Sequence, residues 1–167
     1  MSAPAVTVRL ATDADRAAVT EMFQDLDRHY AQAQGRMVDP AAVTAERVAQ
    51  QLYGAHPTEV ALAEIGGRAI GVASFGMLFP GLGLTGHLQL KDLYVRDGAR
   101  NLGAGEALLR FLARLARERG CTRLDWTTET WNEGAQRLYD RIGAARLLQK
   151  IYYRLEGEAL DRVAREG

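Results

Sequence analysis

The chain has 167 residues, of which 47% are hydrophobic and 25% are charged, as is usual for one soluble globular domain. Its 21 Lys and Arg residues balance 21 Asp and Glu residues, so the broad basic surface of a general nucleic-acid binder is not expected. The single cysteine, Cys121, excludes an intramolecular disulfide framework and a cysteine-based zinc site. We therefore expect one domain, residues 1–167, without a secretory signal and located in the reducing cytoplasm.

The first part of the chain predicts a strand and two helices. Val6–Ala11 alternates apolar and polar residues, as a strand does. A helix is expected over Asp13–Gln34 with Thr12 as its N-cap, because acidic residues follow Thr12 and suit a helix N-terminus. Its apolar face would be formed by Ala18, Met22, Leu26 and Tyr30. Asp39 followed by Pro40 predicts a second helix, Pro40–Tyr53.

The middle of the chain predicts three strands and a long helix. Gly66-Gly67 separates two strand-like runs, Glu59–Ile65 and Arg68–Phe79, and indicates a tight hairpin. His87–Val95 is expected to be a further strand, and Gly103–Arg119 is the strongest helix pattern in the chain.

One uncharged stretch in this region, residues 69–90, is long enough to span a membrane. Its glycines lie around Pro80, which is typical of a loop between two strands. We therefore expect no membrane segment.

The last part of the chain predicts a strand at Arg123–Thr130, a helix at Glu133–Ile142, a final strand at Leu147–Leu155 and a terminal helix at Glu158–Arg165. Up to that terminal helix, the predicted order is β-α-α-β-β-β-α-β-α-β. This order indicates a single α/β domain built on one mixed sheet.

A loop of small residues leads from the strand ending at Val95 into the long helix. The first turn of such a helix carries unpaired N–H groups and the positive end of the helix dipole, and can therefore bind phosphate. Gly103 and Gly105 leave room for a ligand, Asn101 tolerates a left-handed backbone, and Arg100 adds positive charge. A tight turn alone would explain the same residues. A dinucleotide fingerprint fits poorly, because its third glycine would fall at Leu108.

Three segments resemble the GCN5-related N-acetyltransferase (GNAT) superfamily. Arg100-Asn101-Leu102-Gly103-Ala104-Gly105 matches the loop with which this family binds the coenzyme A pyrophosphate. Leu90–Val95 resembles the family's fourth strand. Trp131–Tyr139, followed by Arg141–Ala144, resembles its Asn…Tyr…Gly-Ala segment. The resemblance implies a single acetyltransferase domain that uses acetyl-CoA as cosubstrate and no metal.

Within the superfamily, the chain is most similar to the spermidine/spermine (diamine) acetyltransferase branch over Asp92–Ala144. Those enzymes have Glu where this chain has Lys91. A cation there would repel a polyamine and favour an acceptor that carries an anionic group beside its amine. Both amino-acid-like amines and polyamines stay open as acceptors.

The resemblance also implies which residues hold acetyl-CoA: Leu93, Tyr94, Val95, Arg100, Asn101, Leu102, Gly103, Ala104, Gly105, Glu106 and Asn132. Tyr139 would be the general acid at the sulfur, since a phenol with a pKa of about 10 stays protonated at neutral pH. Tyr139 could equally pack in the core, and Asn132 could cap the following helix.

The base that removes the amine proton has three candidates on predicted strands, which are Asp92, Asp125 and Glu129. Asp92 is the first choice because it is charged within an otherwise apolar strand. An outward-facing Asp92 and a base formed by a water chain are the alternatives.

No metal site is expected, because the three histidines, His29, His56 and His87, lie far apart in the sequence. We expect Cys121 to be a buried structural thiol.

The sequence thus predicts direct acetyl transfer from acetyl-CoA to a primary amine of a small molecule, by a homodimer as in related enzymes, without nucleic-acid or membrane partners. A non-catalytic acetyl-CoA sensor and a protein or peptide N-acetyltransferase are the alternatives.

Overall fold

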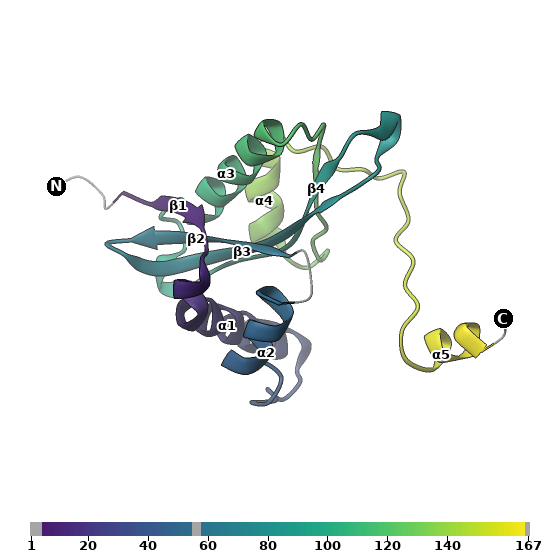
Figure 1. Cartoon of the computed structure of the whole chain (residues 1–167), viewed down its shortest axis with the longest axis horizontal. Coiled ribbons are helices and arrows are strands. Elements are labelled where there is room, and N and C mark those ends of the chain that lie inside the picture. Colours follow the sequence, from purple (N-terminus) through teal and green to yellow (C-terminus); the bar gives the residue numbers. More distant parts are fainter. Residues whose placement is uncertain (1–4, 55–57, 166–167) are drawn as a thin grey trace.

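A five-stranded sheet forms the centre of the fold, and helices cover both of its faces (Figure 1). The computed structural model describes residues 5–54 and 58–165. The strands lie in the order β1-β2-β3-β4-β5, and every neighbouring pair is antiparallel except β4 and β5, which are parallel. Their bounds are β1 Thr7–Leu10, β2 Glu59–Ile65, β3 Arg68–Leu78, β4 His87–Val95 and β5 Leu124–Asp125.

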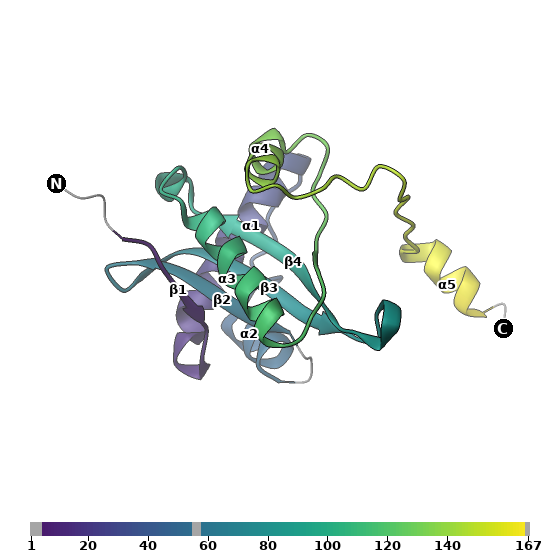
Figure 2. The ribbon, with the colours of Figure 1, turned by 90° about the horizontal axis from the view of Figure 1, so that it is seen from above.

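Two helices lie on each face of the sheet, as Figures 1 and 2 show from two directions. One face carries α1, Arg16–Gln34, and α2, Ala45–Leu52. The other carries α3, Ala104–Glu118, and α4, Glu133–Arg141. Three short 3-10 helices (Asp13–Asp15, Leu82–Leu84 and Asp97–Ala99) lie in connections, and a last helix, α5, spans Gly157–Arg165.

The sheet separates two apolar cores. Leu108 and Leu112 of α3 are fully buried against one face, where they meet Phe75 of β3. Val19 and Met22 of α1 are fully buried against the other. Each fully buried aliphatic side chain of this kind contributes roughly 2 kcal/mol to folding. Both cores therefore hold the sheet between its helices and fix the position of β4, the strand on which the candidate site is built.

Most predicted elements are confirmed within a few residues. The hairpin at Gly66-Gly67, the strand His87–Val95 and the long helix that follows lie where the sequence places them. The uncharged stretch 69–90 forms β3, a loop and the start of β4. No helix among the described residues is long and apolar enough to cross a membrane.

The second helix begins later than predicted, at Ala45. The Asp39 carboxylate accepts a hydrogen bond from the Ala41 N–H (2.9 Å), which makes a local turn after Asp39. Thr44 is the N-cap instead, because its hydroxyl accepts the Arg47 N–H (3.2 Å).

The predicted strand Arg123–Thr130 is wrong over most of its length, since only Leu124–Asp125 pairs with β4. Beyond Asp125 the backbone takes other partners. The carbonyls of Glu129 and Thr130 accept hydrogen bonds from the Gln136 side chain (3.2 and 2.9 Å).

The predicted strand Leu147–Leu155 is also wrong. These residues form an arm that leaves the body of the molecule and ends in α5 (Figures 1 and 2). A strand needs a neighbour to supply its backbone hydrogen bonds, and no described strand lies beside this segment. The order of elements therefore departs from the prediction only at this last strand, since the predicted terminal helix Glu158–Arg165 is confirmed as α5.

Candidate active site

The site is built where β4 loses its neighbour. β4 pairs with β5 only at Leu88 and Gln89, so no described strand covers that edge from Leu90 to Val95. On its other side β4 pairs with β3, and a β-bulge there leaves Lys91 without a partner in the register. Backbone N–H and C=O groups on this part of β4 are thus placed to bind a ligand that enters between β4 and β5.

The loop after β4 presents backbone donors at the start of α3. Asn101 (φ 65°) and Gly103 (φ 84°) are both left-handed, a conformation that glycine adopts without strain. Gly103 is the N-cap of α3 and supplies no side-chain hydrogen bond to the first turn. The N–H groups of Ala104, Gly105 and Glu106 therefore lie at the positive end of the helix dipole without a side-chain cap, which suits the pyrophosphate of coenzyme A.

The charged side chains around this loop are paired with one another. Arg100 contacts Asp97 (2.7 Å), and both side chains are exposed. The Glu106 carboxylate accepts hydrogen bonds from Arg110 (3.0 and 2.8 Å) and Arg141 (3.4 Å). These bonds, mainly that from Arg110, lower the pKa of Glu106. Two arginines neutralise the Glu106 carboxylate, so its charge does not oppose an anion at the Glu106 backbone N–H.

Gly105 allows α4 to approach the start of α3. A Cβ atom at Gly105 would lie 3.1 Å from Cδ2 of Leu138 and 3.8 Å from Cγ2 of Val95. A side chain there would push Leu138 outwards. Since Tyr139 follows Leu138 in α4, this close packing also decides where the tyrosine lies relative to β4 and the loop.

Tyr139 is packed through its ring, while its hydroxyl forms no hydrogen bond with any described residue. The ring lies edge-on to Trp126, with centroids 5.2 Å apart, and contacts the core beneath α3. Burial, together with the nearby Tyr30, raises the pKa of Tyr139 to about 12. The phenol is therefore a proton donor at any physiological pH. Packing and an acid role are compatible here, because they use different parts of the side chain.

Asn132 caps α4, as the alternative interpretation of this residue predicts. Its Oδ1 accepts the N–H of Ala135 (3.2 Å). The same turn is held by Gln136, whose side chain binds the backbone of residues 129 and 130. Asn132 therefore helps to fix the helix that carries Tyr139.

Asp92 lies on the sheet face that α1 covers, and it is partly buried rather than fully exposed. It accepts a hydrogen bond from the hydroxyl of Ser74 (2.6 Å), which is itself only 2% exposed. Burial, followed by the charges of Asp92 and Glu129, raises the pKa of Tyr30 on α1. Tyr30, Asp92 and Glu129 thus lie near one another.

Sequence reasoning missed Ser74 and Tyr30 as site residues. Ser74 is the one hydroxyl within the apolar strand β3, which is a usable signal. The sequence pattern places Tyr30 on an apolar helix face, where an aromatic residue needs no further explanation.

Other candidate residues lie elsewhere or are engaged. Asp125 accepts a hydrogen bond from Arg123 (2.7 Å) at the end of β4 that is remote from Val95. Lys91 is exposed and makes no ion pair with the described residues. His29 contacts Tyr94 (ring centroids 5.7 Å apart), and His56 lies outside the described residues. Cys121 is buried, as expected.

Metal-ligating side chains are scattered. Over residues 5–54 and 58–165, no three His, Cys, Asp or Glu side chains gather as a metal ion would require.

Comparison with known proteins agrees with this architecture. A family model described as the acetyltransferase (GNAT) family matches residues 19–144. A thialysine N-epsilon-acetyltransferase of Caenorhabditis elegans is 35% identical over 83 residues, which are 48% of this chain and 52% of that protein. An L-ornithine N5-acetyltransferase of Arabidopsis thaliana is 31% identical over 55% of this chain and 42% of its own length. The chain thus matches about half the length of these curated relatives.

A solved structure is similar to this chain over nearly the whole length of both proteins. It is an integron cassette protein from the mobile metagenome of V. cholerae, 30% identical, with a TM-score of 0.82. The match covers 96% of this chain and 98% of the other.

Proposed function

The chain belongs to the acetyltransferase (GNAT) family, and we propose that it transfers the acetyl group of acetyl-CoA directly to a primary amine of a small molecule. One juxtaposition carries this proposal. The uncapped first turn of α3 follows the unpaired edge of β4, and Gly105 in that turn packs against Leu138, the residue before Tyr139 with its unpartnered hydroxyl. Binding and cleaving the thioester of acetyl-CoA requires N–H groups that bind its pyrophosphate, a backbone that orients the thioester and a proton donor for the sulfur.

Each group has a defined task in this reaction. The backbone N–H groups of Gly103, Ala104, Gly105 and Glu106 hold the pyrophosphate, and Leu93–Val95 orients the thioester with its backbone. The neutral amine attacks the thioester carbonyl carbon, a C–N bond forms and the C–S bond breaks. Tyr139 donates its proton to the leaving sulfur, which its raised pKa permits. Asp92, held by Ser74, accepts the proton that the amine loses.

The acceptor is proposed to be an amino acid with a side-chain amine. The names of the two curated relatives, for thialysine and L-ornithine, support this class, since both compounds carry a carboxylate beside their amines. In this chain, Asp92 and Glu129 suit an ammonium group, whereas the exposed Lys91 suits the carboxylate.

A cytoplasmic homodimer is the proposed working form. The single cysteine is a buried thiol, which suits a reducing compartment. A long exposed apolar arm in the single chain supports association with a second copy.

Free-thiol release from acetyl-CoA tests the function. The panel of amines contains L-ornithine, thialysine, spermidine, an aminoglycoside and a short peptide with a free N-terminus. We expect release above the no-acceptor background, largest with the two amino acids. Release with the peptide alone would instead identify a peptide acetyltransferase.

A parallel binding measurement separates the remaining outcomes. Acetyl-CoA binding without release from any amine would support a sensor and contradict the enzyme. Absence of binding would contradict the role assigned to the residue 100–105 loop.

A further inference from the structure

One ion pair ties the middle of α1 to the end of β4. Arg96 directly follows β4, and its Nε donates a hydrogen bond to Oδ2 of Asp25 on α1 (2.7 Å). Its Nη2 also donates to Glu21, one turn earlier on α1 (3.2 Å). The other oxygen of Asp25 binds the exposed Arg28 of α1 itself. The side chains of Arg96 and Asp25 are 22% and 21% exposed, whereas that of Glu21 is 67% exposed. Asp25 is therefore the main anchor, because solvent screens the exposed carboxylate more strongly.

The backbone holds Arg96 in place independently of its side chain. Its N–H donates to the Ile70 carbonyl of β3 (3.0 Å), and its carbonyl accepts the N–H of Ala99 (2.9 Å) in the loop before α3. Arg96 is thus fixed between the sheet and that loop. Its guanidinium can fix a helix that packs beside it, because charge-assisted hydrogen bonds are both strong and directional.

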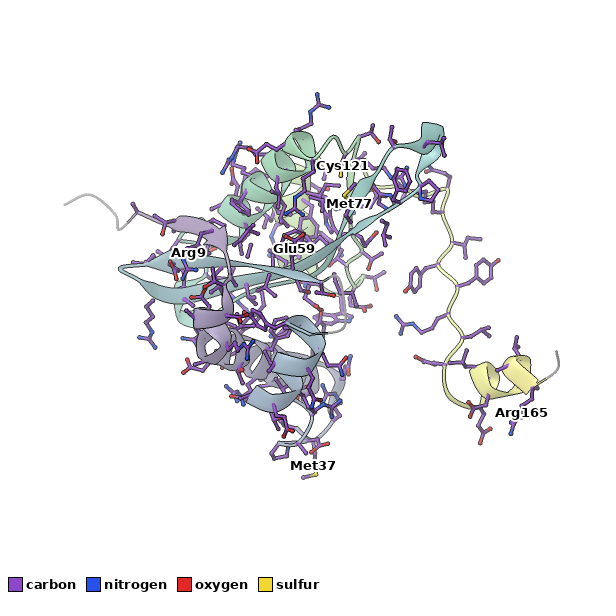
Figure 3. All side chains as sticks on the ribbon, in the orientation of Figure 1. Arg9, Met37, Glu59, Met77, Cys121 and Arg165 are labelled. Atoms are coloured by element: carbon purple, nitrogen blue, oxygen red, sulfur yellow. The ribbon has the colours of Figure 1, made fainter. Side chains whose placement is uncertain are left out.

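The second half of α1 has little apolar packing of its own. Met22 and Leu26 are buried, but beyond Leu26 only Ala31 is buried among the residues of this helix. The chain then turns outwards, and Met37 on the loop after α1 lies well away from the sheet (Figure 3). Apolar packing is non-directional, so it holds a helix on a sheet without fixing its rotation or its shift along its axis. The ion pair with Arg96 supplies this directional constraint.

A ring contact follows in the same register. Tyr94 comes two residues before Arg96 in the chain, and its ring centroid lies 5.7 Å from that of His29, one turn after Asp25. Residues two apart on a strand share a face, and residues four apart on a helix share a side. The ion pair and the ring contact therefore act together on one side of α1.

The half of α1 that Arg96 holds also carries Tyr30, which packs against the core on this face of the sheet. Burial and then the charge of Asp92, the proposed base, raise the pKa of Tyr30. Burial and then Tyr30 raise the pKa of Tyr139, the proposed acid. Tyr30 is therefore close to both groups that would act on the reacting amine. A shift or rotation of α1 would move Tyr30 relative to both.

We propose that Arg96 is a positioning residue for the acceptor: through Asp25 it holds α1, and with it Tyr30, in the position in which the amine binds. In this role Arg96 contacts neither substrate. Its loss weakens the binding of the amine, but it leaves acetyl-CoA binding and the rate of transfer at saturating amine nearly unchanged. The inference rests on the proposed acetyl transfer, because it concerns the acceptor of that reaction.

Steady-state kinetics on full-length variants tests this role. Arg96→Met removes the charge and keeps a long side chain. We expect KM for the accepted amine to rise about tenfold, which corresponds to the loss of one charge-assisted hydrogen bond, while kcat and the Kd for acetyl-CoA change less than about twofold. Arg96→Lys keeps the charge and should restore most of the KM. Equal KM values in the two variants would overturn the proposal, as would a loss of kcat or of acetyl-CoA binding in place of the KM change.

Two further variants show whether the effect belongs to this contact. Asp25→Asn combined with Arg96→Met should raise KM no further than Arg96→Met alone, because both changes break one contact. Arg119→Met is the matched control, since Arg119 is 30% exposed and pairs with Glu59, but joins the end of α3 to β2. It should leave KM within about twofold of the wild type. An equal increase of KM in Arg119→Met would show that any lost ion pair has this effect and would overturn the role of Arg96.

Hydrogen exchange without ligands separates a failure of this inference from a failure of the proposed function. In Arg96→Met, amides of residues 27–34 in α1 should exchange at least about fivefold faster than in the wild type, while those of α3 stay unchanged. A wild type that acetylates no amine would contradict the proposed function itself. Unchanged exchange in α1, in an active or an inactive protein, would overturn the anchoring by Arg96.

Discussion

The chemistry of the site depends on how single side chains divide their tasks. Tyr139 packs its ring against Trp126, and in the proposed mechanism its hydroxyl donates a proton to the thioester sulfur. Asp92 is held by one buried hydroxyl, that of Ser74, on the face of the sheet that α1 covers. Lys91 is the extra residue of the β-bulge in β4, which has no partner on β3. Each of these three residues leads to a prediction of its own.

Replacing Tyr139 by Phe removes the proton donor and keeps the packed ring. We expect kcat to fall by about 100-fold, the usual size of a general-acid contribution, while the Kd for acetyl-CoA changes less than about twofold. Tyr53→Phe is the control, because the buried Tyr53 hydroxyl has no described partner and lies away from the site. Unchanged turnover in Tyr139→Phe would remove this residue from the mechanism.

The raised pKa of Tyr139 makes a prediction about pH. The folded phenol holds its proton up to a pH of about 12, so Tyr139 should cause no loss of kcat between pH 7 and 10. Over this range kcat/KM should rise as the acceptor amine loses its proton. A decrease in kcat between pH 8 and 10 that Tyr139→Phe abolishes would show that the phenol ionises earlier.

Asp92→Asn removes the proposed base without changing its size. We expect kcat to drop by about 100-fold, whereas Asp125→Asn, on β5 opposite Gln89, should change it less than about twofold. Ser74→Ala should lower kcat to a smaller extent and leave acetyl-CoA binding intact, since it loosens the carboxylate. Equal activity of Asp92→Asn and wild type would favour a water chain as the base.

Lys91→Glu tests what selects the acceptor. Reversing this charge should lower kcat/KM for L-ornithine relative to spermidine by about tenfold, as expected for one exposed charge near a charged group. Arg68→Glu makes the same change on the β2–β3 hairpin and should leave the ratio unaltered. An unaltered ratio in Lys91→Glu would show that the acceptor's carboxylate is bound elsewhere.

At the scale of elements, the site depends on the packing of α4 against the start of α3. Gly105→Val would bring side-chain atoms into Leu138 and shift Tyr139 away from β4. We expect kcat to decrease at least about tenfold in stably folded protein, because small displacements of catalytic groups are costly. Gly98→Val is the matched control, since a Cβ at Gly98 meets no atom within 4 Å. Equal kcat values in the two variants would argue against this role for Gly105.

The elements that the sequence predicted correctly are those whose signal is local. The Gly66-Gly67 turn, the apolar period of α3 and the glycine loop before it depend on neighbours in the chain. The start of α2 was missed because Asp39 makes a turn of its own. β5 is shorter than predicted and Leu147–Leu155 is no strand, because pairing needs a second strand that the sequence does not identify. Ser74 reaches Asp92 only through the register of β3 and β4, so that contact was out of reach as well.

At the scale of the whole molecule, an ion-pair network joins the first strand, the start of α1 and β2. Arg9 binds Asp15 through two bonds of 2.7 Å and Glu64 through bonds of 2.7 and 3.2 Å. Asp15 also accepts the Thr12 N–H (2.7 Å). Its pKa is lowered, chiefly by Arg9, so this carboxylate favours the folded state when it is charged.

Acid should therefore destabilise the fold through Asp15. A carboxyl whose folded pKa is depressed contributes stability above its unfolded pKa of about 4 and loses it as the pH falls below that value. Asp15→Asn should lower the free energy of unfolding by about 1 kcal/mol at pH 7 and flatten its decrease below pH 4 in urea titrations. Asp13→Asn changes an exposed neighbour and should do neither. Identical acid profiles for wild type and Asp15→Asn would contradict this.

Stoichiometry measured with labelled acetyl-CoA tests the central claim most directly. Acetyl-CoA with an isotope in its acetyl group is incubated with the protein and L-ornithine, and free thiol and labelled acetyl-ornithine are counted by mass spectrometry. The account predicts one labelled product per thiol released, with both rates reduced together in Tyr139→Phe. Thiol release without labelled product, or neither product while acetyl-CoA binds, would contradict direct transfer to the amine.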